Sequence, residues 1–138
     1  MLLVVDVNVI YSALMKRGNS LIVFEANKLL NKFEFIAPEF LSYELDKKMA
    51  ELLSETNLSQ NELSDTLSFI KEQITFVPYS EFLDKLPGAI ELNFKDAPYL
   101  ALALKYDCGI FSGDKGLKEQ TKVKVLSPRE LLNLLGIE

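Results

Sequence analysis

The chain contains no histidine, and this absence excludes several common kinds of catalytic site. A Ser-His-Asp triad, general acid–base catalysis by imidazole and a His-ligated zinc site all need that side chain. Any chemistry performed by the chain must therefore use carboxylates, a metal ion, or Lys, Ser and Tyr side chains.

Cysteine and long apolar segments are also scarce. The single cysteine, Cys108, cannot form an internal disulfide, and its place at the start of an apolar segment favours a small buried side chain. No run of about 18 apolar residues occurs, so we expect no membrane span and no membrane partner. The opening sequence Met-Leu-Leu-Val-Val-Asp lacks the basic segment and cleavage site of a signal peptide, which predicts a cytoplasmic protein.

The charge balance is mildly acidic, with 20 Asp and Glu against 15 Lys and Arg and a net charge of −5. This argues against bulk electrostatic binding to nucleic acid. It does not exclude a nuclease, because a metal-binding cluster of four acids would account for most of the negative sign. With 138 residues, 49% of them hydrophobic, the sequence predicts one globular domain over residues 1–138 with a substantial core.

Short apolar segments alternate with helical patterns along the whole chain. Continuous apolar runs, as opposed to alternating ones, are typical of strands buried on both faces. The sequence therefore predicts an α/β fold of the Rossmann kind, with a central parallel sheet of about five strands and helices on both faces. The predicted strands are Leu2–Val5, Phe33–Ala37, Thr75–Val77, Cys108–Ser112 and Val123–Leu126.

Several local signals predict where the helices begin and end. Capping boxes at Ser59–Glu62 and Ser127–Glu130 each mark a helix start, and the first of these helices is expected to keep Ile74 in its apolar stripe. A helix is expected from Pro38 to about Glu55, with proline in its first turn. A helix capped by Ser80 is expected to break at Pro87–Gly88.

Four carboxylates follow strands or lie near helix starts in this pattern. Asp6 ends the first strand, Asp114 follows the fourth, Asp96 opens a helix, and Glu44 lies in the helix after the second strand. In parallel sheets, ligands bind beyond the carboxyl ends of the strands, so the four side chains are expected to converge at that edge. Converging carboxylates repel one another unless a cation joins them, which predicts a divalent metal site.

Each acid also has a simpler interpretation when taken alone. Asp96 is a plausible helix N-cap, Asp114 a plausible turn residue, and Glu44 an ordinary surface charge. Asp6 differs, because a carboxylate that ends a fully apolar strand is held near the interior. The metal-site hypothesis therefore depends on the joint pattern of the four.

These motifs together resemble the PIN domain, over nearly the whole chain. The residues that carry the resemblance are Asp6-Val7-Asn8 after an apolar strand, Glu44 in the third helix, Asp96 with Ala101, and Ser112-Gly113-Asp114 after another apolar strand. The resemblance implies a small Mg²⁺- or Mn²⁺-dependent endoribonuclease that hydrolyses RNA phosphodiester bonds. It also implies a homodimer, and a toxin of a toxin–antitoxin pair or a member that acts alone.

Residue by residue, the resemblance assigns both catalysis and metal binding to one acidic quartet, and a supporting polar role to two neighbours. The quartet is Asp6, Glu44, Asp96 and Asp114, and the supporting residues are Asn8 and Ser112. Basic residues expected to help bind a single-stranded RNA are Lys16, Arg17, Lys115 and Lys118. Lys115, Gly116 and Leu117 follow Asp114 where relatives often carry a further polar or acidic residue, so a second metal is expected to be weakly held or absent.

Alternatives from other classes remain open on the residues alone. A haloacid-dehalogenase-like phosphatase also begins with an apolar strand and an Asp-x-Asp motif, but here the second position is Asn8, which cannot act as a general acid. A receiver domain would need an acidic pair beside its phosphate-accepting aspartate. A catalytically silent module that binds nucleic acid or protein is the third alternative, and the intact quartet argues against it.

Overall fold

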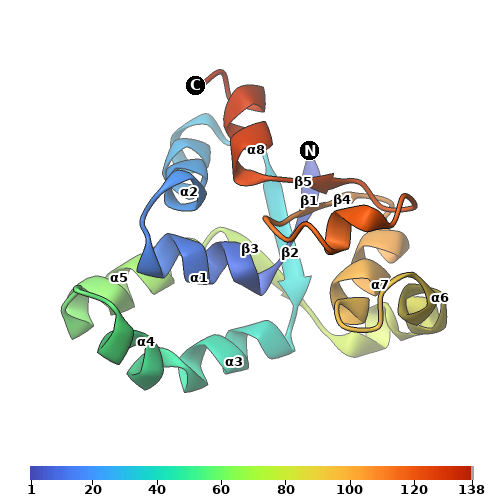
Figure 1. Cartoon of the computed structure of the whole chain (residues 1–138), viewed down its shortest axis with the longest axis horizontal. Helices are drawn as coiled ribbons and strands as arrows, with labels where there is room; N and C mark the ends of the chain where they lie inside the picture. Colours follow the sequence, from blue (N-terminus) through green and yellow to red (C-terminus); the bar gives the residue numbers. More distant parts are fainter. Residues whose placement is uncertain (138) are drawn as a thin grey trace.

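The computed structural model describes residues 1–137 and shows a parallel sheet between layers of helices (Figure 1). The strands are β1 (Leu2–Val5), β2 (Glu34–Pro38), β3 (Ile74–Val77), β4 (Gly109–Phe111) and β5 (Val125–Leu126). The helices are α1 (Val7–Met15), α2 (Asn19–Leu30), α3 (Phe40–Lys47), α4 (Met49–Glu55), α5 (Gln60–Lys71), α6 (Leu86–Leu92), α7 (Ala97–Tyr106) and α8 (Pro128–Leu134), with 3₁₀ turns at Tyr79–Glu81, Leu83–Lys85 and Leu117–Glu119. Within residues 1–137, no helix combines the length and apolar character needed to cross a bilayer.

The five strands are all parallel and lie in the order β3-β2-β1-β4-β5. The chain builds outward from β1 in one direction through β2 and β3, and then returns to β1 and builds in the other direction through β4 and β5. The order therefore reverses between β1 and β4, and in such sheets this switch point opens a crevice beyond the strand ends. This arrangement confirms the predicted α/β fold.

Helices cover both faces of this sheet. On one face α2 packs against the strands through an aromatic cluster, in which the Phe24 ring lies 5.2 Å from Phe35 and 5.7 Å from Phe111 between centroids. On the other face α7 lies against β1, β2 and β4, and α6 packs on α7 (Figure 1). The three inner strands are buried on both sides, which explains why their sequences are continuously apolar.

The region after β2 differs from the prediction, because Pro38 ends the strand and does not begin a helix. The backbone N–H of Glu39 donates to the Val77 carbonyl at 2.9 Å, so the nitrogen of Pro38 faces the β1 side. The pairing of β1 with β2 ends at Ile36, so no ladder hydrogen bond is lost at Pro38. The predicted single helix to Glu55 is also divided at Lys48 into α3 and α4, although neither glycine nor proline marks the division.

Two other predicted boundaries were wrong. Ile74 begins β3 instead of continuing α5, because α5 ends at Lys71 and Ile74 pairs with Phe35. The predicted break at Pro87–Gly88 is instead the first turn of α6, where proline loses no hydrogen bond. The segment after Ser80 forms two 3₁₀ turns and no longer helix. Both capping boxes are present as predicted.

Candidate active site

Asp6 lies at the switch point of the sheet, where β1 ends beside β4. Its backbone N–H donates to the Phe111 carbonyl at 3.1 Å, which continues the ladder between the two strands by one residue. Only 1% of Asp6 is exposed. Its Oδ2 atom accepts hydrogen bonds from the Ser112 hydroxyl at 2.7 Å and from the Asn8 amide at 3.4 Å. The sheet itself therefore fixes this carboxylate, and the two supporting residues predicted from the sequence contact it.

Asp96 lies in the same region as Asp6, although it comes from a later part of the chain, at the start of α7. It is 6% exposed and occupies the N-cap position, but its side chain makes no capping hydrogen bond. The backbone N–H of Asp96 donates instead to the Asn93 side chain at 3.2 Å. Its carboxylate therefore does not cap the helix, although the sequence was also compatible with that simpler role.

Asp114 lies in the loop after β4 and is half-buried. Its backbone N–H donates to the Ser112 hydroxyl at 3.0 Å, and its Oδ1 atom accepts from the backbone N–H of Gly116 at 2.9 Å. Ser112 therefore joins Asp6 and Asp114 through one hydroxyl group. A Cβ at position 116 would lie 3.3 Å from Asp114 Oδ1, so glycine lets the loop turn closely around this carboxylate.

The three aspartates are close enough to influence one another electrostatically. Burial is the largest cause that raises the pKa of Asp6, and the charge of Asp114 adds to it, while the hydrogen bond from Ser112 works in the opposite direction. The pKa of Asp96 is also raised, first by burial and then by the charges of Asp6 and Asp114. The folded chain thus holds these carboxylates where their negative charge is unfavourable, and a bound cation would relieve that cost.

The fourth acid of the predicted quartet, Glu44, does not join the three aspartates directly. It is exposed on α3, although Leu41 and Leu45 beside it are buried as expected. Its charge raises the pKa values of Tyr11, Tyr79 and Tyr99, but it is not among the charges that raise those of the aspartates.

Tyr99 links the two parts of the acidic region. It is 6% exposed, and its pKa is raised by burial first and then by the charges of both Asp6 and Glu44. The structure therefore gathers Asp6, Asp96 and Asp114 and leaves Glu44 outside this group, although its charge and that of Asp6 both act on Tyr99.

The donor chemistry of this region suits a hard divalent cation, but the side chains are not pre-arranged around one. In residues 1–137, no three acidic or cysteine side chains form a ready-made metal site. Carboxylate oxygens are the ligands that Mg²⁺ prefers, and this ion keeps several water molecules, so it can be held by few direct protein contacts. Asp6, Asp96 and Asp114 could hold such an ion, with Glu44 as a more distant acid.

A cavity of about 500 Å³ adjoins the acidic cluster and shares Asn8 and Asp114 with it. Lys115, one of the basic residues predicted to help bind RNA, lines this cavity, as does Lys95, which the prediction missed. The only sequence signal for Lys95 was its position directly before Asp96.

The other predicted basic residues lie elsewhere. Lys118 pairs with Glu130, and the Arg17 guanidinium donates to the Thr66 hydroxyl at 3.2 Å. Lys16 is exposed at the end of α1.

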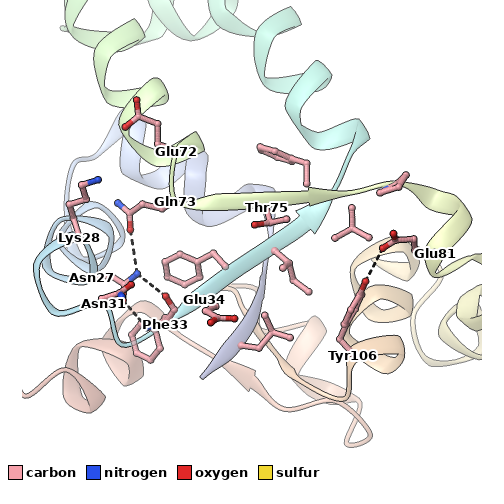
Figure 2. Close-up of a pocket in the computed structure, with 16 residues that line it drawn as sticks. Asn27, Lys28, Asn31, Phe33, Glu34, Glu72, Gln73, Thr75, Glu81 and Tyr106 are labelled. Carbon is pink, nitrogen blue, oxygen red and sulfur yellow. Dashed lines mark hydrogen bonds between the residues drawn. The ribbon is translucent and has the colours of Figure 1, made fainter.

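Another cavity, of about 710 Å³, has none of these acids in its lining. Figure 2 shows that it extends along β2 and β3: near their starts Asn27 donates to the Phe33 carbonyl and to Gln73, and at the other end Glu81 accepts a hydrogen bond from the Tyr106 hydroxyl at 2.8 Å. The end that contains Asn27 and Gln73 lies at the amino edge of the parallel sheet, opposite the edge that carries Asp6. Cavity size alone is therefore a poor guide to a candidate active site, and the converging carboxylates are a better one.

Known proteins similar to this chain agree with the fold. Two solved structures superimpose on it with a TM-score of 0.65. PAE2754 from Pyrobaculum aerophilum is 18% identical, and the match covers 96% of this chain and 88% of that one. VapBC2 from Rickettsia felis, bound to a DNA fragment from their promoter, is 11% identical, and the match covers 92% of this chain and 98% of that one.

Among curated proteins, none matches the chain in sequence. The family model described as "PIN domain", whose members are generally nucleases that depend on divalent metals, matches residues 4–131. That match begins within β1 and includes the other four strands and the three aspartates gathered at the switch point, and the chain therefore belongs to the PIN-domain family.

Proposed function

We propose that this protein is a divalent-metal-dependent endoribonuclease. The observation that carries the proposal is the cluster of Asp6, Asp96 and Asp114 at the switch point of the sheet, where burial and mutual repulsion raise the pKa values of Asp6 and Asp96. Repelling carboxylates in a crevice are expected at a metal-dependent site, and membership of the PIN-domain family supports the assignment to nucleic-acid hydrolysis. The absence of histidine is compatible with this chemistry, because a metal-activated reaction needs no imidazole base.

The residues have distinct roles in this proposal. Asp6, Asp96 and Asp114 hold Mg²⁺ or Mn²⁺, and Glu44 acts from the rim, with the four together forming the catalytic quartet. When bound, the ion lowers the pKa of a coordinated water and neutralises charge on the scissile phosphate. Ser112 and Asn8 donate hydrogen bonds to Asp6 Oδ2 and so orient its other oxygen away from them, toward the crevice.

The decisive experiment compares two substrates and one variant. Purified protein is incubated with a single-stranded RNA and, separately, with a phosphomonoester, in Mn²⁺ and in excess chelator, and the Asp6→Asn protein is the control. We expect RNA cleavage that requires metal and is lost in the variant. Hydrolysis of the phosphomonoester alone would instead favour a haloacid-dehalogenase-like phosphatase, and the absence of both activities would favour a binding module.

We further propose that the protein is a toxin-like member with a protein partner. The structural likeness to VapBC2 supports an antitoxin as that partner. Co-expression with the product of each neighbouring gene, followed by RNA cleavage assays, tests this: an antitoxin should co-purify and suppress cleavage. We place this activity in the cytoplasm, where RNA substrates are abundant.

A homodimer is the proposed assembly, although the structure changes the reason for it. The sequence also favours a dimer because a domain of this size has limited core to cover the apolar segment Leu21–Phe24 and the apolar stripe Leu63–Ile74. The structure buries most of these side chains within the core. Several apolar side chains stay exposed, and three of them lie on α2 and α8, two helices that pack together: Leu29 at 87%, Leu30 at 56% and Leu134 at 39%. Light scattering should give twice the 15.6 kDa mass of one chain, and a monomer at micromolar concentration would contradict this proposal.

A further inference from the structure

The cavity of about 500 Å³ beside the acidic cluster has a wall that a metal site alone does not explain. Asn8 and Asp114 form the side shared with the cluster, while Ser12, Ser20, Lys95 and Lys115 form much of the rest. These last four side chains supply hydroxyl groups and positive charges. The composition therefore changes from acidic to cationic and hydrogen-bond-donating within one continuous crevice.

Ser20 is the most informative residue of this wall. It is 3% exposed, yet its hydroxyl forms no hydrogen bond with any residue in the described part of the chain. No fully buried polar side-chain atom in residues 1–137 lacks a partner, so the Ser20 oxygen belongs to the small exposed part of this residue, and Ser20 lines the cavity. A hydroxyl in this position is available to a ligand, and leaving it unpaired in a dry site would be costly.

The surroundings of Ser20 favour an anionic ligand. It is the second residue of the 12-residue helix α2, whose first turn contains no acidic side chain and whose N-cap residue, Gly18, provides no capping side chain. The amino end of a helix carries a partial positive charge. Lys95 and Lys115, at the same cavity, form no ion pair with any acid in residues 1–137, whereas Lys118 nearby in sequence is paired with Glu130.

We propose that this cavity binds a backbone phosphate of the RNA strand next to the phosphate that is cleaved. The proposal rests on the proposed function, because it takes the acidic cluster as the place of cleavage. Ser20 donates its hydroxyl hydrogen bond to the phosphate, and Lys95 and Lys115 supply its counter-charge. Asn8, shared between the two halves of the crevice, lies between the cleaved phosphate and its neighbour.

The first test measures binding without cleavage. A fluorescent single-stranded RNA is titrated with wild-type protein in chelator at several salt concentrations, and then with the Ser20→Ala, Lys95→Gln and Lys115→Gln variants. Each lost phosphate contact should reduce the slope of log affinity against log salt by about 0.7 for a single strand. We expect that reduction for the two lysine variants, and about fivefold weaker binding for Ser20→Ala, which loses one hydrogen bond.

Matched controls separate this effect from general loss of charge or polarity. Lys28→Gln removes an exposed lysine at the opposite edge of the sheet, and Ser64→Ala removes an exposed helical hydroxyl. Both controls should bind RNA like the wild type, with an unchanged salt slope, and thermal melts should show that all variants are folded. Wild-type affinity and slope in all three cavity variants, or no salt-dependent RNA binding by the wild type, would overturn the proposal.

The second test distinguishes this subsite from the proposed function. A dinucleotide with a single phosphate and a trinucleotide with two are compared as substrates in Mn²⁺. We expect Ser20→Ala and Lys95→Gln to raise KM for the trinucleotide several-fold more than KM for the dinucleotide. If neither substrate is cleaved while the binding differences remain, the nuclease assignment fails and the phosphate subsite stands; if both are cleaved equally by wild type and variants, the subsite fails and the nuclease assignment stands.

Free inorganic phosphate presents the same anionic oxygens as a phosphate of the RNA strand, so it is the alternative ligand for this cavity. Calorimetric titration with inorganic phosphate, using wild type and Lys95→Gln, decides between the two. Phosphate binding that the variant loses, together with RNA binding that it retains, would show a site for the free anion and overturn the strand subsite. Loss of RNA binding in the variant supports the proposal, with or without measurable binding of phosphate alone.

Discussion

Two buried polar clusters lie at opposite edges of the same sheet, and they are built in opposite ways. At the amino edge, Asn27 is 5% exposed and satisfies both ends of its amide: Oδ1 accepts from the backbone N–H groups of Lys32 and Phe33, at 3.1 and 2.8 Å, and Nδ2 donates to the Phe33 carbonyl at 3.1 Å. Gln73 extends the network by donating to the Phe24 carbonyl at 2.9 Å (Figure 2). At the carboxyl edge, Asp6 and Asp96 are equally buried but carry charges that repel.

This difference distinguishes the amide cluster, which has a structural role, from the aspartate cluster, for which we propose a functional one. Neutral amides that meet backbone groups fix the start of β2 against α2 and need no ligand, because every donor and acceptor is used within the chain. Buried carboxylates with raised pKa values reduce stability at neutral pH, and such an arrangement is retained where a ligand or a reaction uses it. Burial of polar side chains alone therefore does not indicate function, whereas burial of charges that no partner within the chain neutralises does.

The largest expected effect is the loss of activity when the acidic cluster is changed. Asp6→Asn or Asp96→Asn should lower the rate of metal-dependent RNA cleavage at least about 100-fold, the range found when a metal ligand or an electrostatic contact of the transition state is removed. This loss is measured by comparing cleavage rates of the variants and the wild type at saturating Mn²⁺. The control is Asn27→Leu, which changes the amide cluster and should leave the cleavage rate of the folded protein unchanged. A similar loss of rate in this control and in the aspartate variants would contradict the proposed difference between the two clusters.

The amide cluster should dominate stability. Asn27→Ala leaves the buried N–H and C=O of Phe33 without partners, which should lower the free energy of unfolding by about 2–4 kcal/mol. Urea denaturation measures this loss, with Asn61→Ala, an exposed asparagine of α5, as the control expected within about 0.5 kcal/mol of wild type. A loss for Asn27→Ala no greater than that of the control would show that the network is not structural.

A smaller effect is expected at Ser112, whose hydroxyl joins Asp6 to Asp114. Ser112→Ala removes the hydrogen bond that lowers the pKa of Asp6, so this pKa should rise further. Cleavage should fall about tenfold near neutral pH, as for the loss of an outer partner of a ligand, and the acidic limb of its pH profile should move to higher pH. Ser112→Thr keeps the hydroxyl and should keep the profile; equal behaviour of both variants would contradict the role of this hydrogen bond.

The smallest expected effect is on the pH dependence of stability without metal. Because the pKa values of Asp6 and Asp96 are raised in the folded state, their contribution to stability is present at pH values below the unfolded pKa and is lost as pH rises through the folded pKa. In chelator, the wild type should melt lower at pH 8 than at about pH 5.5, and Asp6→Asn should melt higher than the wild type at pH 8. Mn²⁺ should raise the melting temperature of the wild type by binding the folded state, and raise it less in the variant.

Thermal melts can also contradict this last expectation. If Asp6→Asn melts lower than the wild type in chelator at pH 8 and responds fully to Mn²⁺, the aspartates do not form one repelling, metal-binding cluster. The Asn27→Ala variant provides the comparison, because its loss of stability should be the same at both pH values.

The parts of this site that the sequence could predict are those fixed by the sheet. Asp6 and Ser112 each follow an apolar strand, and parallel strands bring their carboxyl ends together whatever the intervening helices do. Asp96 was predictable because α7 begins at the same edge. The position of Glu44 relative to these residues depends on how α3 leaves β2 after Pro38 and on the bulk of Tyr99, and neither is a local property of the sequence.

The cavity beside the cluster was not predictable for a related reason. The sequence predicts Ser20 as the N-cap of the second helix, because serine is a common cap residue, but the structure places it inside α2 with Gly18 as the N-cap residue. Its burial results from the packing of α1 against α2 and from the loop after β4, which are separated by about a hundred residues. Contacts between such distant segments leave no periodic or compositional signal.

The hydrogen bond from Ser112 to Asp6 joins residues 106 positions apart in the chain. β1 is the first strand to be synthesised and the centre of the finished sheet, but its partner β4 comes only after α7. A growing chain on the ribosome can therefore pair β1 with β2 and β3 early, while the carboxylates remain unassembled until translation has passed Asp114. Under the proposed function, this topology would delay RNA cleavage until most of the chain has been made, so that the nascent chain could not cut the messenger or the ribosome producing it.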